Sequence, residues 1–330
     1  MPSRLTKPQL LERLLDAATA GGYQTIVTAR THPFGLLIFK PEEAESIKAR
    51  VYIWNCTHGG KNRAADEYRV QLTGVVPEIM AGERTLLLGW HEDYAVFVAF
   101  DITKHAGQAS SSPSIQVKED VLLAAHTKAF SAYERANGEI AVAFRPEFFA
   151  EYVREAPRLH GQRGALGGYV KALNQVGSLS EAAVAAVPRS ERREVIATIR
   201  RKVREQDFRA RVLAAYGYRC AMCGVQLRLV EAAHIVPVAE PGSSDETRNG
   251  VALCSLHHDA YDRNLISFTD RYRIEVSRAS EGDLRSAKLL GGISSFKAAL
   301  RPAILLPADR RDHPNPAYIR RSRELRRWNP

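Results

Sequence analysis

The chain has 330 residues, of which 45% are hydrophobic and 25% are charged. This length is sufficient for two domains that each have a sizeable core, and this composition excludes wholesale disorder. The longest apolar run, near residues 94–100, is far too short to span a bilayer, and the first ten residues lack the apolar stretch of a secretory signal. We therefore expect a cytoplasmic protein with no membrane partner.

The positive charge lies in the second half of the chain, where arginine is the main base. The formal net charge is +10, but residues 1–160 contain 18 Lys+Arg and 19 Asp+Glu, which leaves 29 Lys+Arg and 18 Asp+Glu for residues 161–330. Only four of those 29 bases are lysine, and the planar guanidinium of arginine fits phosphate. A basic half beside a neutral half indicates a polyanion as partner of the basic half. The alternative is a basic surface that serves solubility, and charge alone does not separate the two.

The neutral half begins with a helix and continues as short strands. Leucines at helical spacing predict an amphipathic helix over residues 8–20, which Gly21 and Gly22 end. Short β-branched or aromatic runs predict strands at 23–30, 34–40, 50–56, 67–74, 114–120 and 139–144, and a hairpin of 84–90 with 94–101. A loop is expected at 108–114 and a helix at about 120–135. We predict an α+β domain with an antiparallel sheet over residues 1–160.

Small and flexible residues at 156–168 indicate a boundary, so the second domain is predicted to cover 161–330. Its first part is helical. Between residues 189 and 215, arginines surround an apolar stripe, which indicates an Arg-coated helix, broken at most once, that packs on another element. The end of the chain, from about residue 303, is rich in proline and arginine. The sequence leaves open whether this end is a basic tail on nucleic acid or an exposed terminus.

Four residues with metal-binding side chains form two closely spaced pairs. Two residues separate Cys220 from Cys223 and Cys254 from His257, whereas the fourth cysteine, Cys56, stands apart. Each pair lets two ligands reach one ion from a tight turn, and two such pairs complete the tetrahedral site of structural zinc. In a cytosolic chain of this length, metal binding is favoured over disulfides. Three buried cysteines beside a chance histidine are the alternative.

A second motif is interleaved with the zinc pairs. It consists of AAHIVP (232–237), RNGVALC (248–254), HH (257–258) and AYDRNLISF (260–268), in this order. In these segments the chain resembles the HNH endonucleases of the ββα-metal fold, in the branch of predicted restriction endonucleases. The resemblance covers about residues 205–270 and implies a nuclease core of two strands and a helix with structural zinc knuckles. Several matching motifs in the right order are more specific than one short pattern.

The resemblance also implies a role for three residues. His234 is the general base that takes a proton from the attacking water, which suits a side chain whose ordinary pKa is near neutrality. Asn249 braces the loop that carries His234, because an amide donates and accepts hydrogen bonds at once. His258, on the following helix, binds a divalent ion that stabilises charge on the phosphate and its leaving oxygen. Singly, each residue has a structural alternative: a core histidine, a turn asparagine and a further zinc contact.

One position departs from the family pattern. Many HNH enzymes place Asp or His directly before the base histidine as a ligand of the catalytic ion, but here that residue is Ala233. Asp262 is our substitute because it lies four residues after His258 on one helix face; its structural alternatives are a helix-end cap and an ion pair with Arg263. On the first strand, Glu231 is the other candidate. Oxygen ligands suggest Mg²⁺ or Mn²⁺ as the catalytic ion, although histidine also accepts softer ions.

Together these features predict a metal-dependent endonuclease that hydrolyses phosphodiester bonds of double-stranded DNA. We expect phosphate contacts from Arg200, Arg201, Arg204 and Arg263. A restriction-type role in defence against foreign or modified DNA follows from the resemblance alone. Two alternatives stay open: a zinc-stabilised DNA-binding protein without cleavage activity, and a nicking or structure-specific repair nuclease. A double-strand cut needs two active sites or two visits of one site, and a homodimer would supply the two active sites.

Restriction-type function implies that residues 1–160 recognise DNA sequence or modification. The polar segment 55–69 offers Lys61, Arg63 and Arg69 for DNA contact, or it is an ordinary connection. Aromatic side chains in this domain offer a pocket for a flipped base, although aromatic residues on alternating strands are more often core. They are Trp54, Trp90, Tyr94, Phe97 and Phe100.

Overall fold

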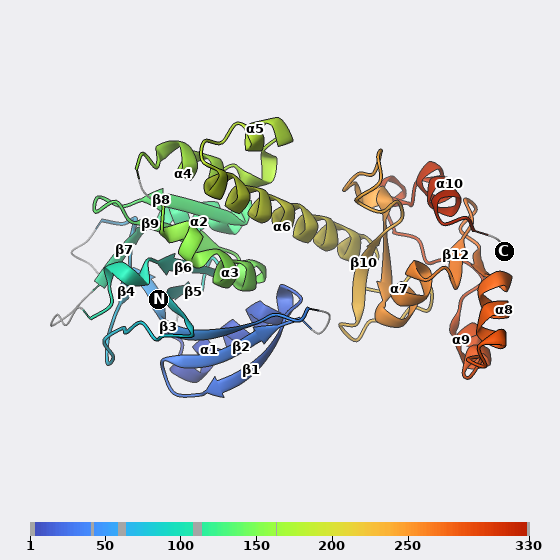
Figure 1. Cartoon of the computed structure of the whole chain (residues 1–330), viewed down its shortest axis with the longest axis horizontal. Coiled ribbons are helices and arrows are strands. Elements are labelled where there is room, and N and C mark those ends of the chain that lie inside the picture. Colours follow the sequence, from blue (N-terminus) through green and yellow to red (C-terminus); the bar gives the residue numbers. More distant parts are fainter. Residues whose placement is uncertain (1–3, 41–42, 59–63, 108–113, 163, 329–330) are drawn as a thin grey trace. The chain divides into compact units, whose positions relative to one another are not determined.

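The computed structural model describes residues 4–40, 43–58, 64–107, 114–162 and 164–328. The chain divides into two compact units, Met1–Val203 (unit 1) and Arg204–Pro330 (unit 2) (Figure 1). Helix α6 (Ser190–Ala215) contributes its first part to unit 1 and its last part to unit 2.

Unit 1 is built on one sheet, to which nine strands of the described residues belong. In spatial order, the main path is β1 (Gln24–Ala29), β2 (Phe34–Phe39), β3 (Ser46–His58), β5 (Arg84–His91), β6 (Val96–Phe100), β9 (Ile140–Phe144) and β8 (Phe130–Glu134). At the C-terminal end of β3, β4 (Glu67–Gln71) pairs with β3, and β7 (Ser114–Lys118) pairs with β4. The pair β3–β5 is parallel and the other pairs are antiparallel. The predicted α+β class is confirmed, with a mixed sheet because β4 returns the chain before it re-enters as β5.

Apolar residues alternate along the strands and fill a core on each face of the sheet. Along β6, Phe97 and Ala99 belong to one core, whereas Val98 and Phe100 belong to the other. Helices α1 (Lys7–Ala20) and α3 (Phe149–His160) pack in the first core, and α2 (Glu119–Lys128) packs in the second. Short 3₁₀ turns lie at Ile102–Lys104, Pro146–Phe148 and Val176–Ser178.

The aromatic residues considered for a base pocket are divided between these two cores. Trp90 and Phe97 belong to the first core, and Trp54 and Phe100 belong to the second, against which Tyr94 packs. They therefore stabilise unit 1 from opposite faces of the sheet and do not line a single pocket. In the segment 55–69, Arg69 forms an ion pair with Glu67 at 2.7 Å, and Lys61 and Arg63 lie outside the described residues.

The helix predicted over about 120–135 ends earlier than its composition indicates. Helix α2 stops at Lys128, Ala129 takes a φ of 73°, and Phe130–Glu134 form β8, which pairs with β9. The prediction is wrong for residues 130–134 because their strand partner is a separate segment of the chain, so tertiary pairing overrides local preference. The predicted hairpin is confirmed as β5–β6, and the predicted loop at 108–114 lies mostly outside the described residues.

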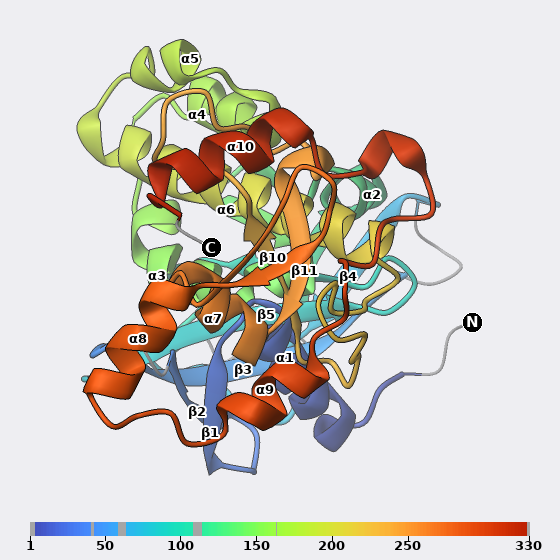
Figure 2. The same ribbon diagram turned by 90° about the vertical axis from the view of Figure 1, so that its right-hand side faces the viewer.

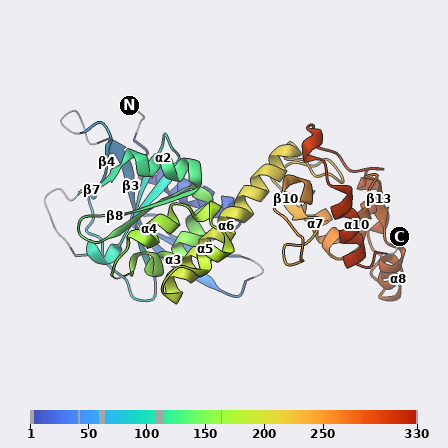
Figure 3. The ribbon, with the colours of Figure 1, turned by 90° about the horizontal axis from the view of Figure 1, so that it is seen from above.

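Residues 161–203, predicted as the start of the second domain, pack in unit 1. Helices α4 (Gly167–Leu173) and α5 (Glu181–Ala185) lie beside the first part of α6 (Figure 3). Their apolar side chains join the core that α1 and α3 fill, and they include Leu166, Tyr169, Leu173, Val184, Val195, Ile196 and Ile199. The compact units therefore divide between residues 203 and 204, at a different place from the predicted boundary at 160/161. The basic helix is continuous from Ser190 to Ala215.

Unit 2 centres on a hairpin and the helix that follows it (Figure 2). Strand β10 (Val230–His234) pairs antiparallel with β11 (Gly250–Cys254), and α7 (Ser255–Asp262) starts directly after β11. This order is the ββα arrangement that the HNH resemblance implies. The unit also contains the hairpin of β12 (Ile266–Phe268) with β13 (Ile274–Val276), and helices α8 (Arg278–Ser286), α9 (Ile293–Ala299) and α10 (Pro316–Leu325).

The Arg-rich C-terminal segment is a packed part of unit 2. On α10, Ile319 is 1% exposed, and the Ser322 hydroxyl lies 3.1 Å from the Tyr261 hydroxyl. The Arg326 guanidinium stands over the Tyr261 ring at 4.3 Å, a cation–π contact. Residues 303–328 therefore pack on unit 2 through part of their surface, and contact of their exposed arginines with nucleic acid stays a prediction. None of the described helices combines the length and the apolar composition that crossing a bilayer requires.

Candidate active site

Gly250 lets helix α6 pack directly against the hairpin. A Cβ at this position would lie 2.3 Å from Cγ2 of Val212 and 3.0 Å from Cζ of Phe208, both on α6. Only a residue without a side chain leaves room for so close an approach. His234 is the partner of Gly250 in the strand register, so the same approach brings Phe208 against the His234 ring.

His234 ends β10, and its ring is held from two sides. It stacks on Phe208 with ring centroids 3.7 Å apart and planes 9° from parallel. Its Nε2 lies 3.2 Å from Oδ1 of Asp245, which is in the loop between β10 and β11. Burial lowers the pKa of His234 below its ordinary value of 6.5, and Asp245 and Glu205 oppose this shift only in part. The imidazole is therefore neutral at pH 7, the form that accepts a proton.

Asn249 is fully buried at the start of β11, in a 3₁₀ turn formed by Thr247–Asn249. Its side-chain oxygen accepts the Val236 N–H at 2.9 Å, and its amide donates to the carbonyl oxygens of Val236 at 3.1 Å and Ser244 at 2.8 Å. These bonds use the donor and acceptor capacity of one amide to tie together both ends of the loop that follows His234. The loop conformation beside His234 thus depends on Asn249.

His258 lies on α7 between two carboxylates. Its Nδ1 is 2.7 Å from Oε2 of Glu231 on β10, and its Nε2 is 3.4 Å from Oδ2 of Asp262, one turn along α7. The hydrogen bond with Glu231 raises the pKa of His258 above 6.5, and the same bond lowers the pKa of Glu231. The Asp262 carboxylate has two partners, because its Oδ2 faces His258 and its Oδ1 accepts a hydrogen bond from Arg326 at 3.2 Å.

The groups around His258 fit a divalent ion, with one geometric constraint. Glu231 and Asp262 lie at different ring nitrogens, so they stand at opposite edges of the imidazole. A ring nitrogen that binds an ion carries no proton. An ion bound at Nδ1 of His258 would therefore also be near Glu231, and an ion bound at Nε2 would be near Asp262. Ala233 is 2% exposed and offers no ligand. In this conformation His258 can therefore join either Glu231 or Asp262 around one ion.

The residues of the predicted zinc site lie together. The ligand atoms of Cys220, Cys223, Cys254 and His257 are all within 4.8 Å of one another, and no other group of three or more His, Cys, Asp or Glu in the described part of the chain is as compact. Nδ1 of His257 lies 3.5 Å from Sγ of Cys220 and 3.2 Å from Sγ of Cys254. Burial raises the pKa of all three thiols, and for Cys220 alone the bonds from His257 and backbone N–H groups outweigh it and lower the pKa to about 6. Cys220 is therefore the thiol of the cluster that most readily forms a thiolate. Three cysteines and one histidine are a donor set of structural zinc.

Family models match two separate parts of the chain. Residues 220–269, which include the cysteine–histidine cluster, His234, Asn249 and His258, match the family HNH endonuclease. These residues form an HNH endonuclease domain. In unit 1, residues 47–153 match the family Methylase-associated X1.

Comparisons with individual proteins add little to this assignment. The comparison with curated proteins finds no match. Among solved structures, the chain is similar to a modification-dependent TagI restriction endonuclease, with 11% sequence identity over 84% of this chain and 81% of that chain, at a TM-score of 0.30. A TM-score this low carries no conclusion about function.

The four arginines predicted to contact DNA differ in their surroundings. In unit 1, the Arg200 guanidinium donates to the carbonyl oxygen of Leu179 at 2.6 Å, and Arg201 is exposed. In unit 2, Arg263 follows α7 with a 77% exposed side chain, 3.7 Å from Asp259. Arg204, by contrast, is engaged by Asp245, its Nε at 2.8 Å and its Nη2 at 2.5 Å from Oδ2. Arg201 and the Arg263–Asp259 pair therefore lie on the surface, where an arginine can meet a phosphate, whereas Arg204 is held by a less exposed carboxylate.

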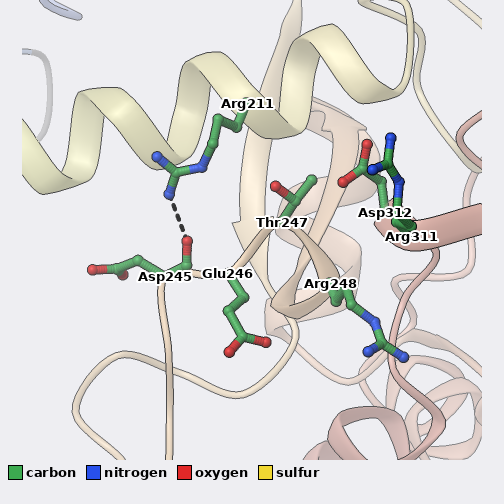
Figure 4. A pocket seen from close by; sticks show the side chains of 7 residues that line it. All are labelled: Arg211, Asp245, Glu246, Thr247, Arg248, Arg311 and Asp312. Atoms are coloured by element: carbon green, nitrogen blue, oxygen red, sulfur yellow. Dashed lines mark hydrogen bonds between the residues drawn. The ribbon is translucent and has the colours of Figure 1, made fainter. Parts of the chain in front are cut away.

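A surface pocket of about 540 Å³ adjoins the HNH hairpin in unit 2. It is lined by Arg211, Asp245, Glu246, Thr247, Arg248, Arg311 and Asp312 (Figure 4). None of these residues is among the predicted site residues, because they come from α6, the hairpin loop and the C-terminal segment, and no local pattern brings them together. The turn-rich composition of 241–250 was the available signal, and it predicts a connection without naming Asp245.

Proposed function

We propose that the chain is a metal-dependent endonuclease that hydrolyses phosphodiester bonds in double-stranded DNA. The observation that carries this proposal is the state of His234 within the HNH domain: a half-buried imidazole with a lowered pKa, fixed by a stack and a carboxylate. A general base needs these properties, since it must be neutral at working pH and fixed in direction.

In this mechanism, His234 takes the proton of the water that attacks phosphorus. Asn249 keeps the loop after His234 in place through its bonds to Val236 and Ser244. His258, with Asp262 or Glu231, would hold a divalent ion, for which Mg²⁺ or Mn²⁺ is expected from the oxygen donors. When bound, such an ion stabilises the negative charge that develops on the phosphate and the leaving oxygen.

Zinc in the cysteine–histidine cluster would have a structural role in this enzyme. Cys254 ends β11 and His257 lies in the first turn of α7, so a zinc ion would fix the helix that carries His258 to the hairpin that carries His234. The four protein ligands leave no open position, which is the arrangement of structural sites.

We also propose that unit 1 selects the DNA and that the enzyme is of the restriction type, with modified DNA as a candidate target. The support is the description of the family that residues 47–153 match, which names an association with methylases. The charge distribution agrees with this division, because residues 1–160 have no net positive charge to hold DNA of any sequence, whereas residues 161–330 do. Two HNH domains would cut both strands in one visit, so we propose a homodimer on DNA.

The test is cleavage of supercoiled plasmid by the full chain with Mg²⁺ or Mn²⁺, beside His234→Ala and the control His126→Ala on the exposed face of α2. Plasmid from methylating and from non-methylating hosts serves as substrate. We expect ion-dependent cutting that is lost in His234→Ala, kept in the control, and different between the two DNAs. Nicked product alone would indicate a nicking or repair nuclease. Binding without cutting by the wild type would favour the zinc-stabilised DNA-binding protein.

A further inference from the structure

Asp245 is the centre of a network that reaches from helix α6 to His234. One oxygen of its carboxylate lies 3.2 Å from Nε2 of His234, and the other accepts both Nε and Nη2 of Arg204. The side chain of Asp245 is 20% exposed, and both of its carboxylate oxygens have partners within unit 2. Because the Arg204 guanidinium holds Oδ2 of Asp245, it also fixes the position of Oδ1, which faces His234.

The backbone of the same residue is also held. Nη2 of Arg211 donates to the Asp245 carbonyl oxygen at 2.7 Å (Figure 4), and the preceding carbonyl, of Ser244, accepts from Asn249. Arg204 and Arg211 are seven residues apart on α6, about two turns, so both project from one face of the helix. Two arginines and Asn249 thus position a single loop residue whose carboxylate meets the His234 ring.

We propose that Asp245 is a positioning residue that holds His234 with its Nε2–H toward the carboxylate and its Nδ1 lone pair toward the attacking water. This inference rests on the proposed nuclease function and deepens it. Phe208 sets the plane of the ring by stacking, and Asp245 sets the rotation of the ring within that plane. Neither contact alone defines the direction of Nδ1; together they do.

The proton transfers balance with this arrangement. The water proton passes to Nδ1, the water oxygen bonds to phosphorus, the bond from phosphorus to the leaving oxygen breaks, and that oxygen takes a proton from solvent. The resulting imidazolium keeps its Nε2–H on Asp245, which stays ionised and stabilises the positive ring. The charged groups that face His234 are Asp245, Glu205 and, through Asp245, Arg204.

Two substitutions test the network in opposite directions. Asp245→Asn removes the charge and leaves the shape, so we expect kcat to fall about 10- to 100-fold with KM changed less than about twofold. The acidic limb of the pH–rate profile should move to lower pH, because the carboxylate that raises the pKa of His234 is gone. Arg204→Gln removes the positive charge behind Asp245, which lets the carboxylate raise the pKa of His234 further. The acidic limb of this variant should therefore move to higher pH, with a smaller loss of kcat. The matched control is Asp283→Asn on the exposed surface of α8.

A second readout does not depend on turnover. In full-length, zinc-loaded protein labelled with ¹⁵N at histidine, the His234 signals are assigned by their loss in His234→Ala. We expect the neutral ring to carry its proton on Nε2 in the wild type and to lose this preference in Asp245→Asn. A wild-type ring protonated on Nδ1, or an Asp245→Asn variant with unchanged kcat, pH limb and tautomer, would overturn the proposal. If the wild type itself does not cut DNA, the nuclease function fails instead, and the tautomer still decides whether Asp245 orients His234.

Discussion

Gly250→Ala is the substitution that tests most directly how the HNH hairpin is joined to α6. The added Cβ would lie 2.3 Å from Cγ2 of Val212 and 3.0 Å from Cζ of Phe208, and a distance of 2.3 Å cannot be kept by real atoms. Either the hairpin or α6 must shift. Because Phe208 stacks on His234 at 3.7 Å, the shift reaches the His234 ring as well as the core.

The expected cost follows from the kind of contact. Inserting one methyl group into a well-packed core costs about 1–3 kcal/mol, which for a domain the size of unit 2 lowers Tm by roughly 3–6 °C per kcal/mol. We expect cleavage to fall by about tenfold or more, since displacement of Phe208 removes the stack that sets the plane of His234. Differential scanning calorimetry of the full chain and plasmid cleavage measure the two effects.

A matched glycine and a compensating change make this prediction refutable. Gly282 lies exposed on α8, and a Cβ added there would have no neighbour within 4 Å. Gly282→Ala should therefore raise the free energy of unfolding slightly, by about 0.5–1 kcal/mol. Val212→Ala creates space for the new methyl, so the double variant with Gly250→Ala should be less destabilised than the sum of the two single changes. Simple additivity, or a Gly250→Ala protein with wild-type Tm and cleavage, would refute the close packing of α6 on the hairpin.

Further predictions concern the zinc cluster, the pH dependence and the DNA surface. Cys220→Ser should lose bound zinc and unfold unit 2, because structural zinc contributes folding free energy; an active, zinc-replete variant, by metal analysis, would argue against the cluster. The cleavage rate should rise with pH in the range below pH 6.5 and stay level above it, because burial lowers the pKa of His234 and a general base must be neutral. A rate that still rises above pH 7 would contradict this assignment. Arg263→Gln should weaken DNA binding and reduce the slope of log K against log salt by about 1. The control Arg285→Gln on α8 should leave the slope unchanged. Equal slopes for wild type and Arg263→Gln would place Arg263 away from the phosphates.

The motifs of the HNH domain could be located from sequence because their constraints are local. Cys254 and His257 must lie one helical turn apart to reach one ion, and His258 then points about 100° away on the same helix. Spacing together with the HNH resemblance therefore assigns His257 to the zinc pairs and His258 to the catalytic ion. The strand–loop–strand–helix order of this segment follows from the same short-range patterns, and it is the order of β10, β11 and α7 in the structure.

The parts that sequence could not supply depend on contacts between distant segments. Arg204 and Asp245 are 41 residues apart, and their pairing follows from how α6 meets the hairpin rather than from either local pattern. An arginine on a basic helix therefore looks like a DNA contact until its partner is known. The same cause explains residues 161–203, whose apolar stripe finds its partners in unit 1. It also explains the C-terminal segment, in which Arg323 of α10 pairs with Glu275 and Arg326, directly after α10, pairs with Asp262.

Ala233, directly before His234, has a structural consequence for the proposed catalytic ion. Ala233 and Glu231 are two residues apart on β10, so both point to the face of the hairpin on which α7 lies, but Ala233 is buried and Glu231 is half-exposed beside His258. The carboxylate of this strand thus lies about 7 Å along the strand from the position that Ala233 occupies. Asp262 stands at the other edge of His258 and is tied to α10 through Arg326. An ion shared with Asp262 would therefore couple its binding to the packing of the C-terminal helix, whereas an ion shared with Glu231 would depend on the hairpin alone.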